Sequence, residues 1–325
     1  GSNFSSIIAI SSKDFERGKV YQTTIDSSKN CAGENAGAQS ISLYLHDSGD
    51  VVINEVLFDP RGSGSDFVEL YNSSKYGINL QGWSLAYFDS KDSLRFNVIS
   101  ETSKSLSKGG YIALNEDNQD ILINYYAAVD TNLFEMNLPS YSNSEGEVIL
   151  YDQLGFQMDQ FAYSVEMHFD LIDNYDGISL ERLDPKRPSS DPGNWHSASS
   201  SVNYATPGYL NSQYYESLLS KSKFSLSSTY ISPDNDEYQD VVNIDYLTSK
   251  TGLVASVNIY TDKGILVREL NSNLLLGSQG SITWDGTNDI GEKVRTGIHI
   301  ILVETFDLEG NRGRYRLPVV VAAKL

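Results

Sequence analysis

Cysteine is almost absent from this sequence of 325 residues, in which Cys31 is the one example. No disulfide can therefore form within the chain, and an oxidising compartment is neither required nor excluded. Hydrophobic runs are also short, and none approaches the roughly 20 residues that a membrane-spanning helix needs. We therefore expect no transmembrane segment, and the first residues do not resemble a signal peptide.

Basic residues are scarce relative to acidic ones. Lys and Arg number 24 against 43 Asp and Glu, which gives a net charge of -19. A chain this acidic repels phosphate backbones and anionic membrane surfaces, so we expect no nucleic-acid partner. The acidity is uneven, because residues 1–220 carry 13 basic and 30 acidic side chains, whereas residues 221–325 carry 11 and 13.

Helical periodicity is nearly missing, and the composition favours strands instead. The chain has 21 Tyr, 12 Phe and 25 Gly, together with many β-branched residues and polar turns. These residue types are typical of strands and of the tight turns that join them. The sequence predicts an all-β protein, and its length suits two or three units that each bury a core.

Sequence patterns of common catalytic sites are not found. There is no Gly-x-Ser-x-Gly motif, phosphate-binding loop or dinucleotide fingerprint. The four histidines, His46, His168, His196 and His299, are scattered singly, without a second ligand at metal-binding spacing. We therefore expect a protein that is not an enzyme.

A strand pair over Val51–Phe58 and Asp66–Asn72 carries two acids where the period of two predicts core. Glu55 shares a face with Ile53 and its apolar neighbours, and Glu69 shares a face with flanking aromatic residues. A carboxylate on an apolar face must be partnered or catalytic. The favoured hypothesis is that both accept hydrogen bonds from loop backbone or from a side chain such as Arg182. The alternative is a glycosidase that uses both as its carboxylate pair.

Six motifs within residues 49–212 occur in the order typical of the lamin tail domain. They are Ile53–Glu55, Asp66–Asn72, Gly82–Leu85, Ser179–Arg182, Asn194-Trp195 and Thr206-Pro207-Gly208-x-x-Asn211. The segment resembles that family, an immunoglobulin-like β-sandwich that is also common in secreted bacterial proteins. The resemblance implies a scaffolding or attachment role for the domain. Independently of it, Gly82 before Trp83 predicts a bulge or a close approach of the backbone.

Residues 224–325 predict a second sandwich of seven strands, after a linker at 213–223. The motifs Val257–Leu270, Thr283–Gly291 and Thr296–His299 resemble the immunoglobulin-like domain of flagellar hook-capping proteins. The chain departs from that family at Ile298-His299, where a Val-Tyr pair is usual.

Residues 1–48 predict three strands, at Ile7–Ile10, Lys19–Ile25 and Ser40–Leu45, which are too few for a sandwich. The runs Phe15–Tyr21 and Asn30–Asn35 resemble the closing strands of bacterial immunoglobulin-like repeats. We interpret this part as the end of a truncated repeat. The fold class is thus two immunoglobulin-like β-sandwiches in tandem with an N-terminal β fragment.

One acidic loop, Ser232–Asp240, is a candidate metal site. Asp234, Asp236 and Asp240 offer alternating oxygen ligands of the kind that calcium prefers. The alternative is a solvated acidic turn, since charge runs are usually exposed. No other cofactor is expected. Asp285, Asn288 and Asp289 surround Gly286, and we expect them to hydrogen-bond the turn backbone.

Aromatic residues suggest a possible carbohydrate surface, because flat rings stack on sugars. The candidates are Tyr125, Tyr126, Tyr141, Tyr163, Tyr175, Tyr214, Tyr215 and Trp195. They share no spacing, which favours ordinary strand positions.

The sequence as a whole predicts a non-catalytic modular region of an exported bacterial protein, at the cell surface or in the periplasm. Its expected role is protein interaction, attachment or spacing, with a protein or another cell-surface component as partner. The alternative is a carbohydrate-binding or accessory region of a surface hydrolase. An export signal would lie outside these 325 residues.

Overall fold

A computed structural model describes residues 14–25, 28–29, 35–88, 91, 93–215 and 221–322. The chain divides into two compact units, with the boundary between Asp50 and Val51. Cys31 and the strand expected at Ile7–Ile10 lie outside the described residues. In the described part, no helix combines the length and the apolar character needed to cross a membrane.

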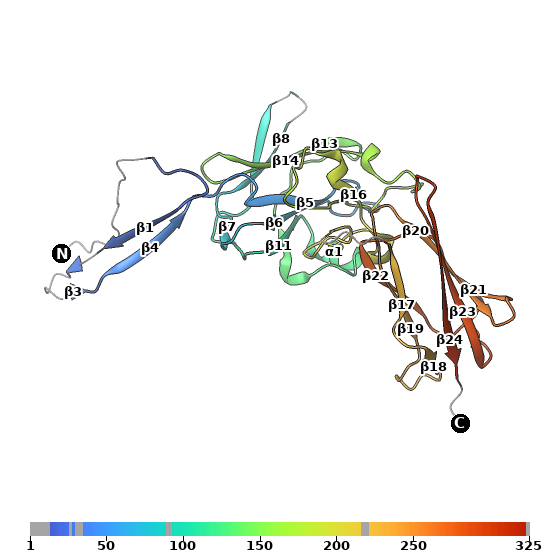
Figure 1. Cartoon of the computed structure of the whole chain (residues 1–325). Helices are drawn as coiled ribbons and strands as arrows, with labels where there is room; N and C mark the ends of the chain where they lie inside the picture. Colours follow the sequence, from blue (N-terminus) through green and yellow to red (C-terminus); the bar gives the residue numbers. More distant parts are fainter. Residues whose placement is uncertain are drawn as a thin grey trace. The chain divides into compact units, whose positions relative to one another are not determined.

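The first unit contains two short antiparallel strand pairs (Figure 1). β1 (Val20–Ile25) pairs with β4 (Gln39–Tyr44), and β2 (Ser28–Lys29) pairs with β3 (Asn35–Ala36). Several of their apolar side chains are exposed, among them Ile41 at 61%. The two longer strands agree with those expected from the sequence, and they are too few to enclose a core.

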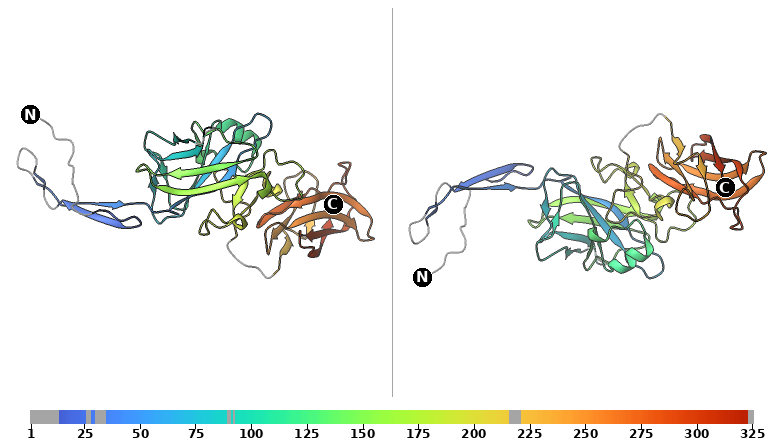
Figure 2. Two further views of the ribbon diagram at one scale, coloured as in Figure 1. Left: turned by 90° about the horizontal axis from the view of Figure 1, so that it is seen from above. Right: turned by 90° about the horizontal axis from the view of Figure 1, so that it is seen from below.

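The second unit begins with a sandwich of a six-stranded and a four-stranded sheet (Figure 2). The strand order is β12-β11-β6-β5-β15-β16 in the larger sheet and β14-β13-β8-β9 in the smaller, and β7 pairs with β10. The bounds are β5 Val51–Leu57, β6 Phe67–Asn72, β7 Ile78–Asn79, β8 Ser84–Phe88, β9 Leu94–Val98, β10 Ser105–Leu106, β11 Tyr111–Asn115, β12 Leu133–Glu135, β13 Glu145–Tyr151, β14 Gln157–Ser164, β15 Leu180–Arg182 and β16 Trp195–Ser197.

The core of this sandwich lies between its two sheets. β5 is rich in β-branched residues, and all seven of its side chains are buried, as expected for a central strand covered on both faces. Trp83 is fully buried, and the rings of Phe161 and Trp195 stack at 3.5 Å between centroids. Gly82 adopts a φ of +74°, and a Cβ there would lie 3.1 Å from Cβ of Gln153. The predicted close approach at this glycine is thus confirmed.

Within the ranges that the structure describes, helical structure is confined to short segments. α1 spans Asn118–Asn124, and its N-cap Asp117 accepts hydrogen bonds from the amides of Gln119 and Asp120. This cap satisfies two of the amides that lack a partner at a helix start. The 3-10 turns are η1 Asp130–Asn132, η2 Val165–Met167, η3 Pro192–Asn194 and η4 Ser200–Val202.

A second sandwich follows in the same unit, with a three-stranded sheet, β17-β19-β22, and a five-stranded sheet, β18-β24-β23-β20-β21. The bounds are β17 Lys223–Leu226, β18 Tyr230–Ile231, β19 Val242–Leu247, β20 Val254–Thr261, β21 Leu266–Leu275, β22 Gln279–Trp284, β23 Gly297–Phe306 and β24 Arg312–Val321. Along β23, buried and less buried side chains alternate, because one face covers a core around Trp284. The all-β class with two sandwiches and an N-terminal β fragment is confirmed.

Many of the hydrogen bonds that join the two sandwiches of the second unit are made at the end of β21 and in the loop that connects it to β22. The hydroxyls of Ser199 and Ser200 donate to the carbonyl of Leu275 at 2.8 and 2.9 Å. The amide of Ser278 donates to the carbonyl of Ser212 at 2.8 Å. A Cβ on Gly277 would lie 2.5 Å from that carbonyl oxygen, so the contact requires glycine. We call these contacts the junction.

Candidate functional site

Three glutamates occupy one row across neighbouring strands of the six-stranded sheet. Glu55 in β5 is the register partner of Glu69 in β6 and of Glu181 in β15. Register partners point to the same face of a sheet, so the three carboxyls lie side by side. All three side chains are 0% exposed. The row therefore places three acids in the protein interior.

Their hydrogen-bond donors come mainly from residues 204–213, which we call the closing segment. Glu55 accepts from the Thr206 amide at 2.9 Å, and Glu69 accepts from the Gly208 amide at 2.6 Å. Glu181 accepts from the Gln213 amide at 2.7 Å and from the Ser212 hydroxyl at 2.8 Å. Neutral amides and hydroxyls thus hold the carboxyls to a segment remote in sequence.

Two side chains outside the closing segment complete the coordination of the carboxyls. The Ser179 hydroxyl donates to Oε1 of Glu55 at 2.5 Å. Nδ2 of Asn54 donates to Oε1 of Glu69 at 2.7 Å, and it also contacts Oδ1 of Asn211 at the same distance. Asn211 in turn donates to the carbonyls of Asn54 and Arg182. The end of the closing segment is thereby attached to strands β5 and β15.

Burial disfavours the charged form of each carboxyl. It is the largest influence on Glu55, whose pKa is raised to about 8, and the neighbouring Glu181 raises this pKa further. Burial also raises the pKa of Glu69 well above its usual range, with Glu55 adding to the shift. The pKa of Glu181 is raised by burial and moderated by its hydrogen bonds. Glu55 is therefore largely protonated at neutral pH.

The hydrogen bonds of Thr206 agree with a protonated neighbour. Its hydroxyl oxygen lies 3.1 Å from Oε2 of Glu55 and 2.8 Å from Oε1 of Glu181. A threonine hydroxyl has one hydrogen to donate, so it cannot donate to both carboxyls. A proton on Oε2 of Glu55 resolves this, since Glu55 then donates to Thr206 and Thr206 donates to Glu181.

Gly208 is the residue that lets the closing segment reach Glu69. Its φ is +84°, and a Cβ would lie 2.9 Å from Cβ of Asn132 and 3.1 Å from the carbonyl oxygen of Val129. A side chain would be strained by this φ and would also collide with the turn at η1. The glycine of the Thr-Pro-Gly motif is therefore required by its backbone conformation and surroundings.

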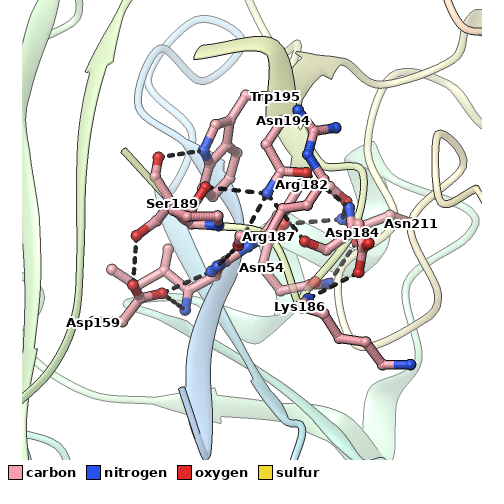
Figure 3. A network of polar contacts seen from close by, with 12 residues as sticks. Asn54, Asp159, Arg182, Asp184, Lys186, Arg187, Ser189, Asn194, Trp195 and Asn211 are labelled. Carbon is pink, nitrogen blue, oxygen red and sulfur yellow. Dashed lines mark hydrogen bonds and ion pairs between the residues drawn. The ribbon is translucent and has the colours of Figure 1, made fainter. Parts of the chain in front are cut away.

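A second polar network fixes the other end of β15 (Figure 3). Arg182, with its side chain 3% exposed, forms an ion pair of 2.8 Å with Asp159 of β14. The guanidinium also donates to the carbonyls of Ile53 and Arg187. Asp159 accepts further hydrogen bonds from the Ser189 hydroxyl and the Ile53 amide. Both terminal nitrogens of Arg182 are thus hydrogen-bonded, whereas its buried Nε has no hydrogen-bond partner among the described residues.

The Asn194-Trp195 motif belongs to the same network (Figure 3). Asn194 exchanges hydrogen bonds with the backbone of Asp184 at 3.0 Å in both directions. The Trp195 indole donates to the carbonyl of Ser189 at 2.9 Å while its ring packs in the core. Both side chains hold the loop between β15 and β16 against the sheet.

The hypothesis of internal hydrogen bonds for Glu55 and Glu69 agrees with these contacts, with one correction. Loop amides bind both carboxyls, as expected, but Arg182 binds Asp159 instead of either glutamate. A glycosidase needs its two carboxyls at the surface of a cleft that admits a sugar. Glu55 and Glu69 instead face the interior with no exposed area.

The acidic loop brings together the three side chains proposed for calcium. One carboxylate oxygen each from Asp234, Asp236 and Asp240 lies within 4.8 Å of the others. Asp240 already accepts hydrogen bonds from the amides of Asn235 and Glu237, at 2.6 and 2.8 Å. These two residues adopt positive φ angles of 66° and 67°, a conformation that favours glycine. Calcium binding stays a prediction.

Two of the three polar side chains expected to bind the turn after Trp284 do so, whereas Asp289 accepts from the Glu269 amide of β21. Asp285 accepts from the Thr287 amide, and Asn288 accepts from the amides of Ile290 and Glu292. Asp285 also pairs with Arg268 at 2.6 Å. In the described ranges, none of the four histidines joins a group of three metal-ligating side chains.

Half of the eight aromatic residues suggested for sugar stacking are core residues. Tyr125, Tyr141, Tyr163 and Trp195 are each 8% exposed or less. Tyr126 is 69% exposed, but it lies on its own beside α1. The burial of these four rings agrees with the favoured interpretation of ordinary structural positions, and the sugar surface stays an alternative.

The outer face of the five-stranded sheet is apolar near the end of β24. Val320 is the register partner of both Tyr230 in β18 and Ile298 in β23, and all three are more than 40% exposed. In the next row, Ile300 stands between Pro318 and Tyr260. Exposed apolar surfaces of this kind are typical of protein-interaction sites.

Comparison with known families now adds to this geometry. Residues 45–164 match the lamin tail domain. The matched part is less than half of the chain and ends with β14. The closing segment and strands β15 and β16 lie beyond it, although both strands complete the six-stranded sheet. The lamin tail resemblance is therefore confirmed over residues 45–164, a shorter range than the predicted 49–212.

Solved structures show only remote similarity. FlgD from P. aeruginosa is 18% identical over 32% of this chain and 78% of that chain, with a TM-score of 0.23. Dimeric latent PorU from Porphyromonas gingivalis is 11% identical over 92% of this chain and 23% of that chain, with a TM-score of 0.27. Curated proteins gave no significant match. The similarity of residues 224–325 to a hook-capping domain thus stays a prediction.

Sequence reasoning missed Asp159, the partner of Arg182. The register of β13 with β14 shifts between Leu150 and Tyr151, so the alternation of faces changes near Asp159. No local pattern predicts such a shift. Gln213 was expected to begin the linker at 213–223, yet its side chain is 0% exposed and bonded to both sandwiches. Residues 216–220 of that linker lie outside the described residues.

Proposed function

We propose that this chain is a non-catalytic region of an exported bacterial protein, in which two joined sandwiches serve spacing and attachment. The observation that carries the proposal is the use made of the polar motif residues. The carboxyl groups of Glu55, Glu69 and Glu181 accept the hydrogen bonds that hold the closing segment in place. The same segment supplies the Ser212 carbonyl to the junction. The acids therefore support a connection between domains.

The junction gives the proposed spacer a defined physical basis. Gln213 donates to the Ser197 carbonyl in the first sandwich at 3.0 Å and contacts the Leu276 carbonyl in the second at 3.3 Å. The Ser201 hydroxyl lies 2.8 Å from the Tyr246 hydroxyl across the same boundary. A boundary with several direct hydrogen bonds resists bending better than a flexible linker does. Export and surface location rest on the lamin tail resemblance.

The attachment role is supported by the apolar outer face of the five-stranded sheet. Strand β24 also carries three exposed arginines, Arg312, Arg314 and Arg316, on the same side as Val320. Arg314 forms an ion pair with Glu304. Such a surface is complementary to a protein that presents apolar residues flanked by acidic ones. We therefore propose a protein partner of that chemistry.

The spacer proposal is tested by introducing a side chain at Gly277. Gly277→Ala places a Cβ 2.5 Å from the Ser212 carbonyl oxygen and should open the junction. We expect one cooperative calorimetric transition for the two sandwiches in the unchanged chain and two transitions in this variant. Gly37→Ala is the matched control, because no heavy atom lies within 4 Å of its Cβ position. Two transitions in the unchanged chain would contradict the proposal.

A further inference from the structure

A cavity of about 460 Å³ lies where the two sandwiches of the second unit face each other. The first sandwich supplies the loop from Phe169 to Asn174, together with Tyr204. The second supplies Asn273 of β21 and Phe306 of β23. A volume of this size is within the range of small-molecule sites, which often form between domains.

Tyr204 is held on the cavity wall in an unusual backbone conformation. Its φ is +71°, in a region that bulky side chains rarely adopt, and the preceding Asn203 has a φ of +63°. Arg61 donates to both the carbonyl and the side chain of Asn203, at 3.0 and 3.1 Å. The Tyr204 carbonyl accepts from the Ser179 amide at 3.0 Å. The surrounding contacts thus fix two consecutive strained residues.

Asn273 is placed on the opposite wall by a β-bulge. Ala255 is the partner of Leu274, and Val257 is the partner of Asn271, so two residues of β21 stand opposite Ser256. Asn273 is one of the two, and its φ is +54°. Bulges redirect a side chain and are frequent next to binding sites. Two independent backbone irregularities therefore line one cavity from different domains.

The cavity lining combines aromatic and aliphatic side chains with polar ones. Phe169 and Phe306 offer ring surfaces, whereas Asp173 and Asn273 offer polar groups. In the ranges that the structure describes, the side chains of Tyr204 and of the exposed Asp173 and Asn273 make no hydrogen bond to the protein, so they remain available to a ligand. None of the lining residues is cationic. The cavity therefore suits a ligand that has apolar faces and several hydroxyl groups, and it disfavours anions.

We propose that this cavity binds a neutral saccharide. Sugar rings present C–H faces that pack on Phe169, Phe306 and Tyr204. Carboxylate and amide groups, as in Asp173 and Asn273, accept and donate the hydrogen bonds that hydroxyls require. The inference does not depend on the spacer proposal, because the two sandwiches can be joined whether or not the cavity is occupied.

The test uses the full chain and saturation-transfer NMR with maltose, cellobiose and chitobiose as probes. We expect ring protons of at least one disaccharide to receive saturation. Asn273→Gly removes the amide while glycine accepts the positive φ, so this variant should stay folded. It should weaken binding by about tenfold, the effect of one lost hydrogen bond. Asn235→Gly is the matched control, since Asn235 is likewise exposed with a positive φ but does not line the cavity.

Phe306→Ala is the second variant, and it removes one ring surface from the cavity. We expect it to abolish saturation transfer while circular dichroism confirms the fold. Absence of transfer to all three disaccharides would overturn the proposal. Binding that both variants leave unchanged would overturn it too, because the sugar would then bind elsewhere. Preferential binding of phenethylamine, an apolar amine, would assign the cavity to cationic ligands and contradict the saccharide class.

Discussion

Glu55, Glu69 and Glu181 stand in one cross-strand row, and their donors are amides, hydroxyls and an asparagine. A buried carboxyl is stable in such a row when it is protonated or fully hydrogen-bonded. The protein meets this requirement with backbone amides from distant parts of the chain. For Glu55 the donor is the Thr206 amide, 151 residues further along the sequence. At the residue scale, the acids therefore act as anchors for the closing segment.

Glu55→Gln should change how stability depends on pH. The folded pKa of Glu55, about 8, lies above its usual value of 4.5, so the folded state binds the proton more tightly. The stabilisation is complete below about pH 4.5 and is lost as pH rises toward 8. Glutamine resembles the protonated acid and should reduce this loss by a few kcal/mol, since one pKa unit corresponds to about 1.4 kcal/mol.

Urea unfolding at pH 5, 7 and 9 would measure this effect. Glu145→Gln serves as the control, because Glu145 is exposed and its replacement should leave the profile unchanged. Parallel pH profiles for the unchanged chain and Glu55→Gln would argue against a buried, protonated Glu55.

Gly208→Ala should destabilise the first sandwich more than an ordinary glycine replacement in a left-handed turn. Gly155→Ala is the control, with a φ of +77° and no heavy atom within 4 Å of its Cβ position. Both variants incur the left-handed penalty of about 1 to 2 kcal/mol. Gly208→Ala adds the collisions with Asn132 and Val129. Equal losses in the unfolding free energy would show that the closing segment does not pack as described.

At the scale of elements, strand β15 carries both networks. Glu181 faces the closing segment, and the adjacent Arg182 reaches Asp159 on the four-stranded sheet. Adjacent residues of a strand point to opposite faces, so one short strand ties the loop on one side and the second sheet on the other. The Ser-Leu-Glu-Arg motif is thus explained by its position in the sandwich.

Asp159→Asn should be strongly destabilising, because it leaves the Arg182 charge buried without its partner. Removing one member of a buried pair costs about 3 to 5 kcal/mol. Asp262→Asn, at an exposed turn, should change stability little. Chemical denaturation of both variants measures the difference, and a loss below about 1 kcal/mol for Asp159→Asn would be inconsistent with the ion pair.

Calcium binding at the Asp234–Asp240 loop is the prediction for the second sandwich. Calcium binding to the folded protein would raise the melting temperature of the second sandwich. It would also release or absorb heat in isothermal titration. Asp236→Asn should weaken both signals, and Asp289→Asn should not. No heat and an unchanged melting temperature on calcium addition would leave the loop as a solvated acidic turn.

Much of the fold follows from local sequence, whereas the contacts of the site do not. The alternation around Glu55 and Glu69 predicts buried acids, and the turn motif predicts Asp285 and Asn288 as backbone acceptors. The partners of the glutamates depend on where the chain returns after residue 204, which no local pattern specifies. Asp159 and Asn273 were missed for a related reason, since a register shift or bulge decides where each side chain points.

At the scale of the molecule, the closing segment has two roles in the second unit. Its hydrogen bonds to the glutamates attach it to the first sandwich. Its residues Ser212 and Gln213 also contact the β21–β22 loop of the second sandwich. A local opening of this segment would therefore expose buried carboxyls and loosen the junction together. This coupling makes the acids relevant to spacing, although they lie inside one domain.

The most direct test is hydrogen exchange at the amides of Thr206, Gly208 and Gln213, which donate to the three glutamates. We predict protection equal to that of amides in β5, because the closing segment opens only when the first sandwich unfolds. The amide of Gln153, exposed and without a hydrogen bond in the described part of the chain, should exchange rapidly in the same experiment. Exchange at the three amides as fast as at Gln153 would contradict the account.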